Sequence, residues 1–356
     1  MNRPDHGGNL AWAVTLADCP VSSLLDFSAS VNPLGPSLLV LQAIQGALTE
    51  LCHYPDPQYQ SLRQALAQHH DLDPAWILPG NGSAELLTLA GRALASLQQT
   101  LILTPAFGDY ERALQGFQAP LTTVPWPPAT PFPLTELQAL ASPQRGLILN
   151  NPRNPTGQLL AVEQILPLLD QFGLVVLDEA FIDFLLPHQQ PTLIPALAHY
   201  PNLVILRSLT KFYSLPGLRL GYALGHPDLL QQWQRWRDPW PVNNLAEAAA
   251  LAALEDRVFQ EKTWAWLGPA REGLALGLGR IPGLFPYPSQ ANFLLVNTKV
   301  PAPWLQEQLL QQHRILIRDC LSFAGLGDAY FRVAVRTKTE NQQLLQALAQ
   351  QMTDRA

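Results

Sequence analysis

The sequence predicts an α/β protein with a large domain, in which helices flank a mostly parallel sheet, and a smaller C-terminal αβ domain. Two observations support this prediction. From about residue 80 onward, short apolar runs alternate with amphipathic segments of helical period, and such alternation is typical of parallel sheets. The chain also has 356 residues, of which 47% are hydrophobic and 14% charged, so it can bury a sizeable core and is not disordered throughout.

The apolar runs are expected to be strands buried on both faces, because they are rich in Leu, Ile and Val and end in turn or polar residues. These runs are Thr100–Leu103, Gly146–Leu149, Leu174–Leu177, Leu203–Leu206 and Leu220–Leu224. Helical patterns separate them, for example at Ala84–Leu97 and Leu159–Phe172. The segment Pro120–Pro133 contains six prolines and is expected to be an exposed connection.

A long helical stretch from Leu245 to Leu278 is expected to precede the smaller domain. The elements expected in that domain are strands at Asn292–Val296, Ile315–Ile317 and Phe331–Val335 and a final helix near Glu340–Met352.

Composition and charge exclude several classes of protein. The net charge is −6 and no basic block occurs, so nothing indicates a nucleic-acid partner. Residues 1–9 are polar and lack the apolar core of a secretory signal, and four acidic residues interrupt the most apolar stretch, Ile165–Leu186, which excludes a membrane span. The three cysteines are far apart and lack metal-binding spacing, so we expect a cytoplasmic protein with no metal site.

Two charged residues lie at or shortly after the ends of predicted strands, where ligands bind in open α/β sheets. Asp178 follows Leu174–Leu177, and a buried carboxylate there needs a cation or a strong donor, although a structural ion pair would serve equally well. Lys211 follows Leu203–Leu206 among apolar and aromatic residues. Loss of water would lower the pKa of its amine and make it a nucleophile, unless the side chain reaches the surface.

Other features could bind anions or orient a ligand. Residues 80–83 (GNGS) precede a helix expected to begin near Ala84, with Ser83 as its cap, and a helix N-terminus attracts an anion. Residues 150–157 follow a strand and could form a rigid loop that presents Asn154. Each of these is also consistent with an ordinary turn.

Arg318 and Arg332 lie at the ends of C-terminal strands, where paired guanidinium groups suit carboxylate and phosphate, although single surface arginines are common. An amine nucleophile, a carboxylate, an amide, a phosphate-binding turn and outer arginines are together what pyridoxal phosphate requires. In that chemistry the lysine forms a Schiff base and the carboxylate keeps the pyridine nitrogen protonated.

Three motifs resemble the fold-type-I aminotransferases of class I/II, in the branch of the histidinol-phosphate aminotransferases. They are residues 150–157 (NNPRNPTG), 177–184 (LDEAFIDF) and 207–221 (RSLTKFYSLPGLRLG), and the resemblance extends over nearly the whole chain. It implies that Lys211 is the Schiff-base lysine and that Asp178 is the partner of the ring nitrogen.

The resemblance also implies the remaining cofactor contacts. Asn154 would bind the phenolic oxygen, and Phe107 would stack on the ring. The cofactor phosphate would be bound by Gly82, Ser83, Ala84, Ser208 and Arg219. Tyr54 matches a tyrosine that reaches the phosphate from a neighbouring subunit, which implies a homodimer with shared sites. One departure is Phe181, where many members of this branch have a tyrosine, so Asn154 would be the main partner of the phenolic oxygen.

The two ends of the chain resemble the threonine-phosphate decarboxylases of cobalamin synthesis. The matching stretches are residues 6–9 (HGGN), 25–36, 317–320 and 331–337. This resemblance implies decarboxylation of a small phosphorylated amino acid, L-threonine O-3-phosphate, to (R)-1-amino-2-propanol O-2-phosphate. The implied substrate-binding residues are Gly7, Gly8, Asn32, Asn154, Arg318 and Arg332, with Arg318 at the phosphate and Arg332 on the carboxylate side.

Two other functions remain open at this point. A histidinol-phosphate or related aminotransferase would use the same cofactor and would need a keto-acid acceptor. A non-catalytic sensing or scaffold protein on the same fold is disfavoured, because Lys211, Asp178 and Arg219 are intact. The expected organisation is a substrate-covering segment (1–45), a large cofactor-binding domain (46–240), connecting helices (241–285) and a small C-terminal domain (286–356).

Overall fold

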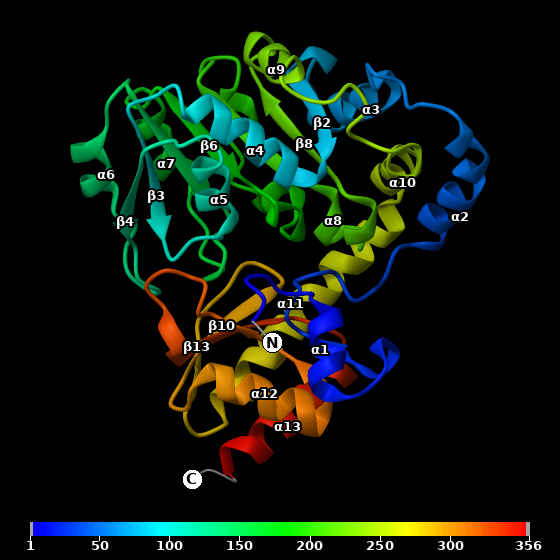
Figure 1. The fold of residues 1–356 in the computed structure, drawn as a ribbon, viewed down its shortest axis with the longest axis vertical. Helices are drawn as coiled ribbons and strands as arrows, with labels where there is room; N and C mark the ends of the chain where they lie inside the picture. The colour runs from blue at the N-terminus through cyan, green and yellow to red at the C-terminus, as the bar shows by residue number, and fades with distance from the viewer. Residues whose placement is uncertain (1–2, 354–356) are drawn as a thin grey trace.

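The computed structural model describes residues 3–353 and confirms the predicted α/β class (Figure 1). A seven-stranded sheet lies in the larger part of the molecule and a four-stranded sheet in the smaller part. The strands of the larger sheet are β2 (Ile77–Asn81), β3 (Gln99–Thr104), β4 (Leu121–Pro125), β5 (Arg145–Asn150), β6 (Leu174–Asp178), β7 (Leu203–Ser208) and β8 (Leu220–Gly225). Their spatial order is β2-β8-β7-β6-β5-β3-β4.

The directions of these strands determine where polar residues gather. Strands β3 to β7 pair in parallel, whereas β8 is antiparallel to both of its neighbours, β7 and β2. The carboxyl ends of β5, β6 and β7 therefore lie side by side along one edge of the sheet. Ligands bind at this edge in open α/β sheets.

Helices cover both faces of the large sheet because successive strand residues alternate between the faces. One face packs on α4 (Gly82–Leu94), α5 (Asp109–Gln115) and α9 (Pro227–Gln234), with Val176 of β6 in their core. The neighbouring Leu177 packs in the core of the opposite face, with α6 (Leu134–Leu140) and α7 (Val162–Leu169). This two-sided burial explains the continuous apolar runs in the sequence.

The smaller part combines the two ends of the chain (Figure 1). Its antiparallel sheet has the order β12-β13-β10-β9, and its elements are β9 (Leu284–Pro286), β10 (Phe293–Thr298), β12 (Arg318–Asp319), β13 (Tyr330–Ala334), α12 (Ala302–His313) and α13 (Lys338–Thr353). The N-terminal β1 (Leu25–Asp26) pairs in parallel with β11 (Ile315–Leu316). Helix α1 (Leu10–Ala17) packs against α12, where Trp12 shares a core cluster with Leu310.

The remaining α-helices are α2 (Leu38–Gly46), α3 (Gln60–His70), α8 (Leu209–Phe212), α10 (Asn244–Glu255) and α11 (Arg257–Gly279). Helix α11 runs from the larger part into the smaller one (Figure 1). No helix within residues 3–353 is long and apolar enough to span a membrane. The expected boundaries at residues 45, 240 and 285 stay predictions.

Two expected helices differ from those observed. The stretch from Leu245 to Leu278 is two helices, because Asp256 interrupts it and its carboxylate accepts a hydrogen bond of 3.0 Å from the Phe259 amide at the start of α11. Helix α7 is shorter than expected and covers only Val162–Leu169.

Two strands of the large sheet were not anticipated from the sequence. Strand β2 runs directly into α4 at Gly82, so Ser83 lies in the first helical turn and is not the cap that was expected. The apolar run in the sequence of β2 is short, because Pro79 and Gly80 occupy the middle of the strand. Strand β4 lies within the proline-rich segment that was expected to be only a connection; at a sheet edge, prolines do not interrupt the hydrogen bonds of neighbouring strands.

Candidate functional site

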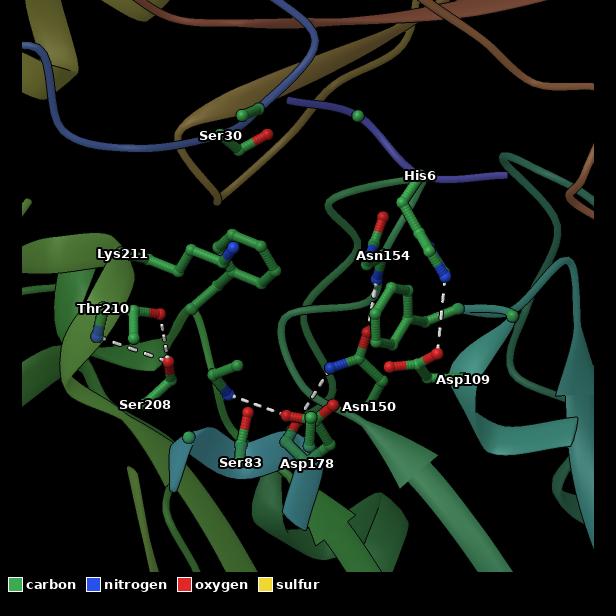
Figure 2. A pocket seen from close by; sticks show the side chains of 18 of the residues that line it. His6, Ser30, Ser83, Asp109, Asn150, Asn154, Asp178, Ser208, Thr210 and Lys211 are labelled. Atoms are coloured by element: carbon green, nitrogen blue, oxygen red, sulfur yellow. Dashed lines mark hydrogen bonds and ion pairs between the residues drawn. The ribbon is translucent and has the colours of Figure 1, made fainter. Parts of the chain in front are cut away.

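A cavity of about 210 Å³ lies at the carboxyl ends of β5, β6 and β7, with the N-terminal segment and the smaller part of the molecule on its other side (Figure 2). Most of the residues assigned from the sequence line it. They are Gly7, Gly82, Ser83, Ala84, Phe107, Asn154, Asp178, Ser208, Lys211, Arg219, Arg318 and Arg332. The structure therefore brings together residues that are separated by more than 300 positions in the sequence, from Gly7 to Arg332.

Asp178 is the last residue of β6, and its carboxylate is held in one orientation. Its Oδ2 accepts a hydrogen bond of 2.6 Å from the Tyr110 hydroxyl, and its Oδ1 accepts one of 2.9 Å from the Ala180 amide. Burial raises the pKa of Asp178, while these two hydrogen bonds and the charge of Lys211 oppose that shift. The carboxylate keeps lone pairs for a further donor from the cavity.

The adjacent residue Glu179 has a separate, structural role. It is fully buried, and its Oε2 lies 2.7 Å from Nε of Arg207, which also pairs with Asp183 at 2.7 Å. The sequence alone was consistent with a structural ion pair at the end of this strand. Glu179 forms that ion pair, whereas Asp178 faces the cavity.

Lys211 lies on the short helix α8, which follows β7 directly. Burial lowers the pKa of its amine to about 8, and the positive charges of Arg332 and Arg219 act in the same direction. Asp178 has the opposite and smaller effect. At neutral to mildly alkaline pH, a substantial fraction of this amine is therefore neutral and nucleophilic.

The first turn of α4 forms a site suited to a phosphate group. A helix N-terminus presents free N–H groups and positive partial charge. Gly82 has a φ of 73°, and a Cβ on it would lie 2.6 Å from Nη2 of Arg219. A Cβ on Gly221 of β8 would likewise lie 2.6 Å from the Ser83 nitrogen, so only glycine allows α4 to begin here. The hydroxyl groups of Ser208 and Thr210, 2.7 Å apart, complete this side of the cavity.

Asn154 and Arg332 meet across the cavity. Nη1 of Arg332 donates a hydrogen bond of 2.5 Å to Oδ1 of Asn154, and its Nη2 donates one of 3.1 Å to the Ser28 carbonyl. Because Oδ1 accepts from Arg332, the Nδ2 group of Asn154 is left as a donor. Nε of Arg332 is buried and has no hydrogen-bond partner within residues 3–353, so it can still bind an anion.

Arg318 lies opposite Arg332 in the register of β12 and β13. Its guanidinium donates to the carbonyl of Pro4 at 3.2 Å, and also to the carbonyl of Asp5 and the hydroxyl of Ser322. These hydrogen-bond acceptors are neutral, and the Asp319 carboxylate lies 3.8 Å from Nη1, so an anion entering the cavity within hydrogen-bond distance would be a stronger partner for the guanidinium.

Three of the residues assigned from the sequence do not line the cavity. The backbone N–H of Asn32 donates to the Lys211 carbonyl at 3.0 Å and its Nδ2 to the Phe212 carbonyl at 2.9 Å, and its assignment to the substrate stays a prediction. These two hydrogen bonds fix the turn that carries Lys211. The Gly8 amide donates to the Ser28 hydroxyl at 2.7 Å. Tyr54 is 79% exposed and stacks on Trp240, so its expected role toward a partner subunit stays a prediction.

The site also contains residues to which the sequence reasoning gave no role. Ser30 is buried against the cavity, and its Oγ has no hydrogen-bond partner in the described part of the chain. His6 lies near Phe107, with ring centroids 5.7 Å apart, and its Nε2 is 3.5 Å from the carboxylate of Asp109 (Figure 2). Tyr110 contacts Asp178, and Thr210 lies beside Ser208. Except for that between Thr210 and Ser208, these contacts join segments that are distant in the sequence, so sequence patterns do not predict them. Only the position of Tyr110, three residues after Phe107, could have indicated that it lies near the cavity.

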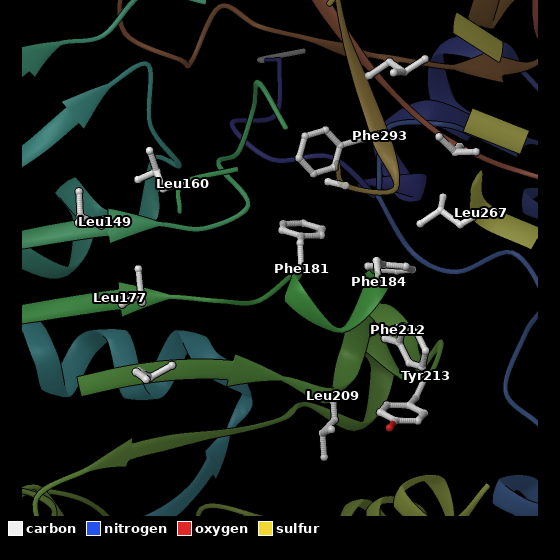
Figure 3. Packing of buried hydrophobic residues seen from close by; sticks show 14 of the residues in the cluster. Leu149, Leu160, Leu177, Phe181, Phe184, Leu209, Phe212, Tyr213, Leu267 and Phe293 are labelled. Atoms are coloured by element: carbon white, nitrogen blue, oxygen red, sulfur yellow. The ribbon is translucent and has the colours of Figure 1, made fainter. Parts of the chain in front are cut away.

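Phe181 lines the cavity without contributing a hydroxyl group. Its ring packs edge to face on Phe293 of β10, with centroids 5.0 Å apart, in the core that joins the two parts of the molecule (Figure 3). A phenylalanine thus gains apolar packing where a hydroxyl would face the cavity.

The residues present fit pyridoxal phosphate. The α4 turn with Arg219 suits the phosphate, Asp178 the ring nitrogen, Nδ2 of Asn154 the phenolic oxygen and Lys211 the aldehyde. Arg318 and Arg332 then remain for the substrate.

Comparisons with known proteins agree with this geometry. The family model "Aminotransferase class I and II" matches residues 22–348. A threonine-phosphate decarboxylase from Salmonella typhimurium is 40% identical over 98% of this chain and 96% of its own length. Histidinol-phosphate aminotransferase 1 from Nitrosococcus oceani is 35% identical over 92% of this chain and 89% of its own length. The crystal structure of a histidinol-phosphate aminotransferase from Sinorhizobium meliloti, in complex with pyridoxal-5'-phosphate, superimposes with a TM-score of 0.89 at 25% identity, over 98% of this chain and 95% of that one.

We predict that borohydride reduction of the protein with bound pyridoxal phosphate attaches the cofactor covalently to Lys211. Lys211→Ala should remove this label and lower turnover by several orders of magnitude, because Lys211 is the only lysine among the described residues that line the cavity. The rate at which the cofactor-free protein forms the link should rise as the pH passes about 8, because only the neutral amine is nucleophilic.

Peptide mapping after reduction locates the label, and the exposed Lys262 provides a control through Lys262→Ala. A label at Lys262, Lys299 or Lys338 would show that the assignment of Lys211 is wrong.

Proposed function

Because the chain belongs to the class I and II aminotransferase family, we propose that it is a pyridoxal phosphate-dependent decarboxylase of L-threonine O-3-phosphate. The product would be (R)-1-amino-2-propanol O-2-phosphate, a precursor in cobalamin synthesis. The threonine-phosphate decarboxylase from Salmonella typhimurium, which matches this chain over nearly its whole length, supports the proposal.

The observation that carries the proposal is the pair of arginines that face the cavity from directly opposed positions of β12 and β13. Threonine phosphate has two anionic groups, a phosphate and a carboxylate, on adjacent carbon atoms. Arg318 would bind the phosphate, and Arg332, through its unpartnered Nε, would bind the carboxylate side. Histidinol phosphate has a phosphate but no carboxylate, so it would leave one of these arginines without an anionic partner.

The residues of the chain then determine which bond reacts. When bound, pyridoxal phosphate would supply an electron sink for one bond at the substrate Cα, and the orientation of Cα would determine which bond breaks. Arg318 and Arg332 bind the two ends of the substrate and thereby fix the rotation of Cα, which uses binding energy for orientation. Asp178 stabilises positive charge at the ring nitrogen, and Lys211 donates the proton that replaces the lost carboxylate on Cα.

The N-terminal segment would complete the site after substrate has entered. Arg318 binds carbonyl groups of Pro4 and Asp5, and His6 and Gly7 line the cavity behind them. Exclusion of water by this segment would strengthen the interactions of the arginines with the substrate.

We further propose that the protein forms a homodimer through exposed apolar side chains on and after α2. This surface, called here the α2 surface, consists of Leu38, Leu39, Leu41, Leu48, Leu51 and Tyr54, of which Leu38 is 70% exposed. A cluster of this kind exceeds the scattered apolar side chains that are usual on a monomer. The homodimer would bring Tyr54 to the cofactor phosphate of the partner subunit. We also propose a cytoplasmic location, which is supported by three free cysteines.

The proposed activity is tested by incubating the purified protein with threonine phosphate, serine phosphate or histidinol phosphate, each with 2-oxoglutarate. Decarboxylation predicts release of CO2 from threonine phosphate without formation of glutamate. Glutamate formed from histidinol phosphate, with no CO2 from threonine phosphate, would instead identify an aminotransferase. Serine phosphate lacks one methyl group and should react with a specificity constant that is lower by about tenfold to a hundredfold.

We predict that Arg318→Ala lowers kcat/KM for threonine phosphate by at least about tenfold to a hundredfold, because a charge-assisted hydrogen bond to the substrate phosphate is lost. The cofactor spectrum should not change, because Arg219 and Ser208 are intact. Deletion of residues 1–9 should act in the same direction, and the two changes together should be less than additive, since Arg318 contacts this segment directly.

Steady-state kinetics and absorbance spectra test this prediction, with the exposed Arg280→Ala as the control. Loss of the cofactor from Arg318→Ala, or undiminished turnover of threonine phosphate, would contradict the phosphate-binding role.

A double change of Leu38 and Leu41 to glutamate should convert the homodimer to monomers and weaken cofactor binding, because it places charges in the α2 surface. Sedimentation velocity and cofactor titration measure the two effects. Val258→Glu, at a 77% exposed apolar position on α11, is the matched control. A monomeric wild-type protein, or an unchanged dimer in the double variant, would contradict the proposed interface.

A further inference from the structure

Tyr110 is a buried residue of α5 whose hydroxyl group faces the end of β6. It is 2% exposed, and its hydroxyl donates a hydrogen bond of 2.6 Å to Oδ2 of Asp178. Within residues 3–353, this is the only side chain that donates a hydrogen bond to the Asp178 carboxylate. Asn150 donates to the backbone carbonyl of Asp178 instead, at 2.8 Å.

Tyr110 is also connected to the aromatic wall of the cavity. Its amide donates to the Phe107 carbonyl at 3.1 Å, and the two rings meet edge to face with centroids 5.8 Å apart and an interplanar angle of 88°. Phe107 and Tyr110 therefore form one rigid unit at the start of α5. Phe107 faces the cavity, while Tyr110 lies behind it against Asp178.

We propose that Tyr110 is a positioning residue that fixes the orientation and the negative charge of Asp178 toward the pyridine nitrogen of the bound cofactor. This inference rests on the proposed function, because it takes pyridoxal phosphate as the occupant of the cavity. Tyr110 does not line the cavity, so it acts only through Asp178.

The electrostatics at the end of β6 agree with this role. Burial raises the pKa of Asp178, and the hydrogen bond from Tyr110 is the largest of the influences that oppose this shift. Ala180 and the charge of Lys211 act in the same direction, whereas the charge of Asp109 opposes them. The pKa of Tyr110 itself is raised well above its usual value by burial and by the charge of Asp178, so its hydroxyl remains a donor at working pH.

Removal of the Tyr110 hydroxyl should therefore destabilise the ionised form of Asp178 relative to its neutral form. The carboxylate would keep only the hydrogen bond from Ala180, and its charge would be less stable in a site that excludes water. A less charged Asp178 would in turn hold less positive charge on the ring nitrogen. The cofactor would still bind, because its phosphate, phenolic oxygen and aldehyde contact other residues.

The test uses the complete protein with pyridoxal phosphate whose ring nitrogen carries an NMR-active isotope. The chemical shift of that nitrogen reports its protonation independently of turnover. We compare wild type, Tyr110→Phe, Asp178→Asn and Tyr222→Phe. Tyr222 is a matched control, because it is also a buried tyrosine whose hydroxyl makes one hydrogen bond of 2.8 Å, to His70, away from the cavity.

We expect Tyr110→Phe to move the nitrogen signal from the protonated position toward that of Asp178→Asn, and to lower kcat about tenfold to a hundredfold with little change in KM. Tyr222→Phe should match wild type in both measurements. A wild-type nitrogen signal and kcat in Tyr110→Phe, while Asp178→Asn loses both, would overturn the role of Tyr110 and leave the proposed function intact. A wild-type signal in Asp178→Asn would instead show that the cofactor placement itself is wrong.

A second variant covers the case in which Tyr110→Phe does not fold. Replacement of Tyr110 by a tyrosine with fluorine beside the hydroxyl keeps the shape of the ring and makes the O–H group a stronger donor. The apparent pKa of the ring nitrogen should then rise above its wild-type value in an NMR pH titration. An unchanged pKa would overturn the proposal.

Discussion

The burial of one carboxylate, that of Asp178 at the end of β6, is the constraint on which the site depends. A carboxylate that has lost its water is costly unless donors and positive charge surround it. The fold supplies Tyr110 from α5, the Ala180 amide from the same turn, and Lys211 from the end of the neighbouring β7. These groups satisfy the carboxylate only in part, so a cationic nitrogen in the cavity would complete its surroundings. The next residue, Glu179, pairs through its Oε2 with Arg207 and also accepts a hydrogen bond from the Thr192 hydroxyl, and it does not line the cavity.

The binding groups are divided between the two parts of the molecule. The large sheet and α4 supply the phosphate-binding turn, the lysine and the carboxylate that suit a cofactor. The small antiparallel sheet supplies Arg318 and Arg332, which suit a substrate. The single hydrogen bond between Arg332 and Asn154 joins these two sets of groups across the cavity. A substrate anion bound to Arg332 would therefore alter its hydrogen bond with Asn154, the residue proposed to contact the cofactor, and would connect substrate binding to cofactor orientation.

The sequence predicted what strand order and motif spacing determine. Lys211 and Asp178 follow strongly apolar strands within specific motifs, so their meeting at one sheet edge was foreseeable. The short β2 and the proline-rich β4 were missed because their apolar signals are weak. The hydrogen bonds of Asn32 to the backbone of Lys211 and Phe212 were not foreseen from its motif, because they join segments far apart in the sequence. Tyr110 and Ser30 were not identified because their contacts come from helix packing and chain crossing, which local sequence patterns do not encode.

The opposed arginines have a consequence for the release of product. In the proposed reaction the carboxylate leaves as CO2, whereas the phosphate stays on the product. Arg332 would lose its anion at that moment, and Arg318 would keep its own. The substrate would therefore form two ion pairs with the protein and the product only one, so the product would bind more weakly. Because Arg318 also binds the Pro4 and Asp5 carbonyls, these neutral acceptors can replace the departing phosphate, so the guanidinium need not remain buried without a partner between turnovers.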